Sequence, residues 1–249
     1  MAWKVCYLPM KKQTKKPAKL QSLAIICDGN RSWARERGLK VFMGHEKAVN
    51  EVFEDLIDRS IELDIQYLTF WIFSTENWKR DKMEVDYLMN LFRKIFDERI
   101  AGWDKKGVRF KMIGDIKGFA EDIQTRIKEG ETLTKDNAAI TVTLAMNYGG
   151  RDELKRTMQK IARKVAEGSL SPENITEDTI STHLDTHYMP DPDLIIRTGK
   201  DNTRLSGFMS WQQQYSEILF PGFYFPDFTA KKLDEVVAEF SKRNRRFGG

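Results

Sequence analysis

Short apolar runs alternate with longer segments of helical periodicity along most of this chain. The runs 23–27 (LAIIC) and 67–73 (YLTFWIF) are apolar at consecutive positions, as in strands that are covered on both faces. Between them, apolar residues recur at helical spacing, for example at Val49, Val52 and Phe53. Strands that alternate with helices usually form parallel sheets. The pattern therefore predicts an α/β protein.

The further runs 108–113, 140–146 and 194–196 supply three more candidate strands, and a second amphipathic pattern spans 87–96. With 249 residues, 41% of them hydrophobic, the chain can fill one large core. We predict a single domain at 20–249, with a mostly parallel central sheet of about six strands flanked by helices. Residues 1–19 are basic and lack periodicity, which indicates a flexible N-terminal arm.

The net charge of +4 suits an anionic partner, but its sign does not choose among phosphates, nucleic acid and an acidic membrane surface. The two cysteines, Cys6 and Cys27, have no metal-ligand spacing and do not suggest a secreted disulfide scaffold. No segment approaches the ~20 apolar residues that are needed to cross a bilayer. We expect a cytoplasmic protein whose membrane contact, if it has any, is peripheral.

Polar residues directly follow the first candidate strand. Asp28 can cap a helix, Gly29 keeps the backbone accessible, and Arg31 adds positive charge beside the free N–H groups of a helix start. On these residues alone, an ordinary helix cap is the more common outcome. In open α/β sheets, however, ligands bind beyond the carboxyl ends of the strands. This loop is therefore a candidate anion site.

Two other strands are followed by similar clusters. The segment 74–80 (STENWKR) offers hydroxyls, a carboxylate, an amide, an indole and cations after the second strand, although it could also be a simple turn. Arg197 and Arg204 follow the strand at 194–196, with Ser206 close by. Guanidinium groups pair well with phosphate oxygens. All three clusters should lie at one edge of the sheet.

In order along the chain, these segments resemble the motifs of the cis-prenyltransferase family, which includes undecaprenyl and dehydrodolichyl diphosphate synthases. The matching stretches are CDGNRSWARERGLKVFMGH at 27–45, STENWKR at 74–80, and Arg-Thr-Gly followed by Arg-x-Ser at 197–206. Trp-Gln and Tyr-x-Glu at 211–217 and the ending RRFGG at 245–249 also match. The resemblance covers roughly residues 20–249.

The resemblance implies a magnesium-dependent transferase with an apolar tunnel. Such an enzyme condenses an allylic isoprenyl diphosphate with isopentenyl diphosphate. The resemblance assigns catalysis to Asp28 and Asn77, and Mg²⁺ binding to Asp28 and Glu217. Asp28 would help the allylic diphosphate to leave, and Asn77 would take part in proton removal. By periodicity alone, the apolar helix faces that could form the tunnel look the same as ordinary core.

Substrate contacts follow from the same resemblance. His45 would contact the allylic diphosphate, although an isolated histidine is more often a surface residue. Arg197, Arg204 and Ser206 would bind the diphosphate of isopentenyl diphosphate. The full predicted set is Gly29, Asn30, Arg31, Ser32, Trp33, His45, Ser74, Thr75, Glu76, Trp78, Arg80, Arg197, Arg204 and Ser206. We also expect a homodimer, because the aromatic run 220–225 would form an apolar surface if left uncovered.

The chain departs from the family pattern at two positions. Ser32 and Val41 stand where the family commonly carries arginines near the allylic diphosphate. This leaves open an unusual donor or acceptor with a branched or non-isopentenyl product. A non-catalytic subunit of the same fold is disfavoured because the motif residues are retained. A nucleic-acid-binding module is disfavoured because no recognition motif is present.

Product length is the last expectation. In long-chain members, small residues commonly occupy the positions that align with Ile72 and Met146, and both are larger here. Larger side chains at the tunnel floor take volume from the growing product. We therefore expect a product of short or medium length. Trp71 should face the opposite side of the sheet from Ile72 because side chains alternate along a strand.

Overall fold

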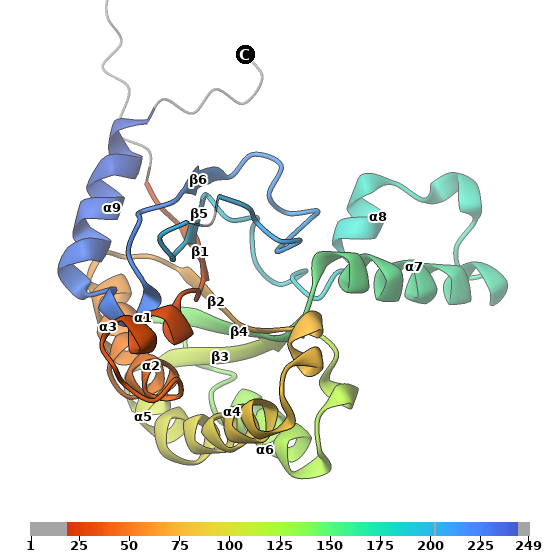
Figure 1. The fold of residues 1–249 in the computed structure, drawn as a ribbon. Helices are drawn as coiled ribbons and strands as arrows, with labels where there is room; N and C mark the ends of the chain where they lie inside the picture. Colours follow the sequence, from red (N-terminus) through yellow and green to blue (C-terminus); the bar gives the residue numbers. More distant parts are fainter. Residues whose placement is uncertain (1–18, 202, 244–249) are drawn as a thin grey trace, which may run out of the picture.

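The computed structural model describes residues 19–201 and 203–243, and within them it contains a six-stranded sheet of order β3-β4-β2-β1-β5-β6 (Figure 1). Every pairing in this sheet is parallel. The strands are β1 Ser22–Ile26, β2 Tyr67–Ser74, β3 Val108–Ile113, β4 Ile140–Tyr148, β5 Leu194–Arg197 and β6 Glu217–Leu219. The single α/β domain that the sequence predicts is confirmed.

The helices lie between the strands, as the periodicity indicates. They are α1 Asn30–Glu36, α2 Met43–Lys47, α3 Phe53–Glu62, α4 Lys82–Lys94, α5 Ile100–Lys105, α6 Glu121–Leu133, α7 Gly150–Ala166, α8 Glu177–Ser181 and α9 Ala230–Lys242. Two π-helical segments, η1 Ala48–Val52 and η3 Ile95–Arg99, join α2 to α3 and α4 to α5. A 3₁₀ segment, η2 Thr75–Lys79, follows β2 directly. Figure 1 shows α7 and α8 extending to one side, away from the sheet.

The sheet is buried on both faces, which explains the continuous apolar runs. On β1, Leu23 and Ile25 belong to the larger core, which also contains side chains of α3, α4, α6 and α9. Ala24 and Ile26 point to the other face, where they pack in a smaller cluster with Phe208. Because both faces are covered by protein, the strand cannot alternate between apolar and polar residues.

The sequence analysis missed one strand, and two segments that it interpreted fall mainly outside the described residues. The edge strand β6 has three residues, too few for a recognisable apolar run. The predicted arm at 1–19 lies outside the described residues except for Lys19, and the ending at 245–249 lies outside them entirely. Among the described helices, none has both the length and the apolar character that a membrane span requires.

Candidate functional site

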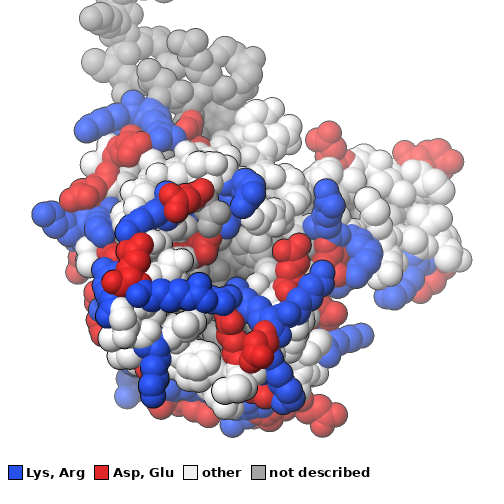
Figure 2. Space-filling model, viewed as in Figure 1, with Lys and Arg blue, Asp and Glu red and all other residues white. Residues whose placement is uncertain are grey.

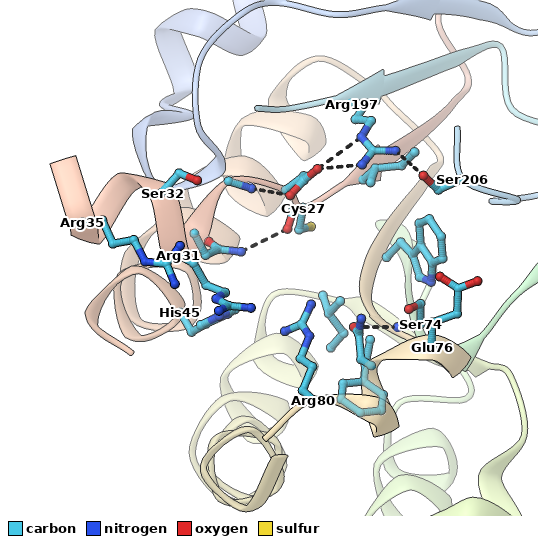
Figure 3. A pocket seen from close by; sticks show the side chains of 18 residues that line it. Cys27, Arg31, Ser32, Arg35, His45, Ser74, Glu76, Arg80, Arg197 and Ser206 are labelled. Carbon is cyan, nitrogen blue, oxygen red and sulfur yellow. Dashed lines mark hydrogen bonds and ion pairs between the residues drawn. The ribbon is translucent and has the colours of Figure 1, made fainter. Parts of the chain in front are cut away.

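A cavity of about 450 Å³ lies at the carboxyl ends of β1, β2 and β5, where the motif loops meet (Figure 3). Figure 2 shows a hollow near the middle of the same view as Figure 1, with Lys and Arg side chains at its edge and Asp and Glu side chains among them. Most predicted site residues line the cavity: Asp28, Gly29, Asn30, Arg31, Ser32, His45, Ser74, Glu76, Asn77, Arg80, Arg197 and Ser206. The three motif loops therefore form one site.

The turn after β1 requires a glycine. Gly29 has φ 92°, in the left-handed region, and a Cβ at this position would lie 2.4 Å from Cδ1 of Tyr224. Gly29, without a side-chain cap, is also the N-cap of α1. The expectation that Asp28 caps this helix is thus wrong, because its carboxylate accepts from the N–H of Gly29 and is directed toward β5.

Asp28 and Arg197 connect the loops after β1 and β5. The guanidinium of Arg197 donates to Oδ2 of Asp28 from Nη2 (2.7 Å) and Nε (3.2 Å). Its Nη1 donates to Oγ of Ser206 (2.7 Å) and to the carbonyl oxygen of Arg204 (2.5 Å). Arg197 is 8% exposed, whereas the Asp28 side chain is 33% exposed. Asp28 is therefore held in place yet accessible from the cavity.

The loop after β2 is organised by its own side chains. Oδ1 of Asn77 accepts from the backbone N–H of Ser74 (3.0 Å), which fixes the start of η2. Trp78 donates from Nε1 to Oδ1 of Asn147 (2.8 Å) and is not among the residues that line the cavity. Asn77 thus lies in the site that the resemblance predicts for it, whereas Trp78 lies beside it.

Positive charge gathers on the side of the cavity formed by α1 and the start of α4. Glu84 is buried and pairs with Arg80 (2.9 Å) and Arg31 (3.6 Å). Burial, with smaller contributions from Arg80 and Arg31, lowers the pKa of His45 to about 4. Nε2 of His45 and Nε of Arg31 are buried without a hydrogen-bond partner among the described residues. An anion bound in the cavity would offer acceptors to these groups.

A narrow apolar pocket of about 30 Å³, called the extension below, borders the cavity. It shares Cys27, Asn30, His45 and Ile72 with the cavity. Its remaining lining comes from the two amphipathic segments and one loop: Ala48, Val49, Phe53, Leu88, Leu91, Phe92, Ile95 and Phe225. Most of the two apolar stripes is therefore core, and only a small part borders open space.

The two residues expected at the tunnel floor occupy different positions. Ile72 is partly buried and lines both the cavity and the extension. Met146 is fully buried in the larger core and lines neither of them. Trp71 packs on the opposite face against Phe208, as the alternation predicts, although it also borders the cavity.

Three other predicted substrate residues do not line the cavity. Trp33 is buried and donates from Nε1 to Asp227 (2.7 Å), so its part is structural. Thr75 lines a neighbouring pocket with Gly149 and Gly150. Arg204 reaches the site through its carbonyl oxygen, which accepts from Arg197.

Glu217, the second predicted metal ligand, does not meet Asp28 within the chain. It lies at the start of β6, paired in register with Leu194, and its carboxylate accepts from Nη1 of Arg243 (3.0 Å). Arg197 is three residues further along the neighbouring strand, about 10 Å toward the carboxyl end. Within residues 19–201 and 203–243, no group of three or more His, Cys, Asp or Glu side chains could hold a metal ion.

The cavity also contains residues that the motifs did not single out, namely Arg35, Cys27 and Ile26. Arg35 follows Arg31 by four residues on α1, so helical spacing could have indicated that both lie on one face. Burial, and to a lesser degree Asp28, raises the pKa of the Cys27 thiol.

Comparison with known proteins agrees with the geometry. A family profile described as "Putative undecaprenyl diphosphate synthase" matches residues 26–248. "Isoprenyl transferase 2" of Bradyrhizobium diazoefficiens is 44% identical over 227 residues, which are 91% of this chain and 89% of that protein. The "Ditrans,polycis-undecaprenyl-diphosphate synthase ((2E,6E)-farnesyl-diphosphate specific)" of Vibrio vulnificus is 40% identical over 226 residues, with coverage of 91% and 89%.

Solved structures show the same fold. Lavandulyl diphosphate synthase from Lavandula x intermedia, in complex with dimethylallyl diphosphate, has a TM-score of 0.89 and 36% identity, and covers 93% of this chain and 99% of its own. A probable undecaprenyl diphosphate synthase from Campylobacter jejuni has a TM-score of 0.77 and 33% identity, with coverage of 93% and 100%. The chain therefore belongs to the cis-prenyltransferase family.

Proposed function

We propose that this protein is a magnesium-dependent transferase that condenses an allylic isoprenyl diphosphate with isopentenyl diphosphate to a cis-prenyl diphosphate of short or medium length. The observation that carries the proposal is that a polar, arginine-lined cavity shares lining residues with a narrow apolar extension. The first suits a diphosphate, and the second suits a small hydrocarbon.

The reaction needs a site that binds negative charge and excludes water from a cation. When the allylic donor ionises, its C1–O bond breaks and the electron pair leaves with the diphosphate. The double bond of isopentenyl diphosphate then attacks the allylic cation, and loss of a proton restores neutrality. In this proposal Arg31, Arg80 and His45 hold the donor diphosphate, and Arg197 and Ser206 hold the acceptor; in support, all five line the cavity. Asn77 would take part in proton removal.

The residues at the cavity fit a magnesium ion shared with the substrate. Mg²⁺ is usually held by one or two carboxylates together with substrate phosphates, so one accessible carboxylate is enough on the protein side. Asp28 supplies it. When bound there, the ion would neutralise charge that develops on the departing diphosphate.

The volume of the extension supports a short product. A cavity needs about 10–15 Å³ to accept one water, so 30 Å³ corresponds to roughly two. The aromatic rings of Phe53, Phe92 and Phe225 are among the side chains that line the extension. A long polyprenyl chain would need more room than 30 Å³, so lining side chains would have to move.

The test is an assay with purified protein, Mg²⁺ and labelled isopentenyl diphosphate. Allylic donors of five, ten and fifteen carbons are offered separately, and the dephosphorylated products are sized by reversed-phase chromatography. We expect the five- and ten-carbon donors to be preferred, and each to be extended by one or a few isoprene units. Absence of product from every donor would refute the transferase, and a product as long as undecaprenyl would refute the proposed length.

A branched product is a second candidate, which the likeness to lavandulyl diphosphate synthase favours. The small extension would accept a donor of the size of dimethylallyl diphosphate, the molecule bound in that structure. Incubation with dimethylallyl diphosphate alone, followed by mass spectrometry of the released alcohol, separates the candidates. A ten-carbon product without isopentenyl diphosphate supports the branched alternative, and its absence excludes it.

A further inference from the structure

The donor side of the cavity lacks two cations that the family resemblance leads one to expect, since Ser32 and Val41 stand at those positions. Arg35 lies three residues after Ser32 on α1 and lines the same cavity. Residues three apart on a helix are neighbours on its surface. We propose that Arg35 binds the diphosphate of the allylic donor and takes the place of the arginine expected at position 32. This inference rests on the proposed function.

Arg35 is not used to hold the fold together. Its side chain is exposed and has no hydrogen bond or ion pair with any residue that the structure describes. Arg37, two residues later, is the opposite case, because its guanidinium lies 4.6 Å from the ring of Trp33 and pairs with Asp227 (3.2 Å). Of these two cations, one in the last turn of α1 and one at its C-cap, Arg35 is therefore the one that is available to a ligand.

The side chains around Arg35 carry an excess of positive charge, which favours binding of an anion. Arg31 and Arg80 share the single carboxylate of Glu84, which leaves this trio one positive charge in excess. Arg35 adds a further positive charge on the same cavity wall. Figure 3 shows Arg31 and Arg35 extending from α1 toward the part of the cavity where His45 lies. A diphosphate placed there could also accept from the unpartnered Nε of Arg31.

The matched variants Arg35→Gln and Arg37→Gln test the proposal, because each removes one positive charge near the C-terminal end of α1. Binding of a thio analogue of dimethylallyl diphosphate, which does not ionise, is measured by titration calorimetry with Mg²⁺. Arg35→Gln should weaken this binding by about tenfold, at the lower end of the effect of a charge-assisted hydrogen bond. Arg37→Gln should leave it within about twofold, since a distant exposed charge is screened.

Kinetics then locate the effect. Arg35→Gln should raise the KM of the allylic donor and leave the KM of isopentenyl diphosphate unchanged. Ser32 is exposed and lines the cavity, so Ser32→Arg in the Arg35→Gln background should restore donor affinity without disturbing the core.

Three results would overturn the inference: unchanged analogue affinity in Arg35→Gln, an equal loss in Arg37→Gln, or no recovery in the double variant with its thermal unfolding unchanged. The binding measurement needs no turnover. A wild-type protein that binds the analogue but makes no product would instead count against the proposed function alone.

Discussion

Shortening Ile72 should lengthen the product, because this side chain borders both the cavity and the apolar extension. Ile72→Ala removes three carbons, and at the same roughly 10–15 Å³ for each water-sized group this opens about 30–45 Å³. The extension has about 30 Å³. Three carbons are fewer than the five of one isoprene unit, so we expect a gain of at most one unit in the main product.

Met146→Ala is the matched control. Met146 is fully buried in the same core but lines neither the cavity nor the extension. Its truncation should lower the free energy of unfolding by about 2–5 kcal/mol, whereas Ile72→Ala, at a partly exposed position, should cost about 1–2 kcal/mol. The less destabilising variant should therefore be the one that changes the product.

Products are compared after dephosphorylation by reversed-phase thin-layer chromatography, and unfolding is followed in urea. Two outcomes would refute the reasoning. One is an unchanged product distribution from a folded, active Ile72→Ala enzyme. The other is an equal lengthening in Met146→Ala, which would mean that general loosening of the core, and not the extension, sets the length.

Three further predictions concern the loop after β1 and its neighbour His45. Asp28→Asn should reduce kcat by at least about a hundredfold at saturating Mg²⁺, because the carboxylate is the proposed metal ligand; comparable turnover would contradict that role. Gly29→Ala should lower the free energy of unfolding by about 2–4 kcal/mol, because a Cβ there would clash with Tyr224 and the backbone has a φ of 92°. A loss under about 0.5 kcal/mol in urea titrations would disprove the steric argument. The pKa of His45 is lowered to about 4 in the fold. In the unfolded chain His45 has its ordinary pKa near 6.5, so below that pH the unfolded chain binds a proton that the folded protein does not bind. The free energy of unfolding should therefore fall by about 2 kcal/mol between pH 7 and pH 5. His45→Gln should show a smaller fall over that range, and an equal one would assign the pH dependence to other groups.

The sequence by itself determined the fold class and the location of the site. Strands buried on both faces need continuous apolar residues, so β1 and β2 were visible as runs. The carboxyl ends of parallel strands meet at one edge, so the loops that begin at Asp28, Ser74 and Arg197 had to converge. Local order in the chain was sufficient for these conclusions.

Only the tertiary structure decided which side chains reach the site. Sheet register places Glu217 about 10 Å below the level of Arg197, and no motif carries register. Ile72 in β2 and Met146 in β4 both come after buried residues of their strands, yet packing places Ile72 at the extension and Met146 inside the core. The partners of Arg37 turn it away from the cavity, while Arg35 has none and lines it. Such distinctions depend on contacts between residues far apart in the chain, which periodicity and spacing do not encode.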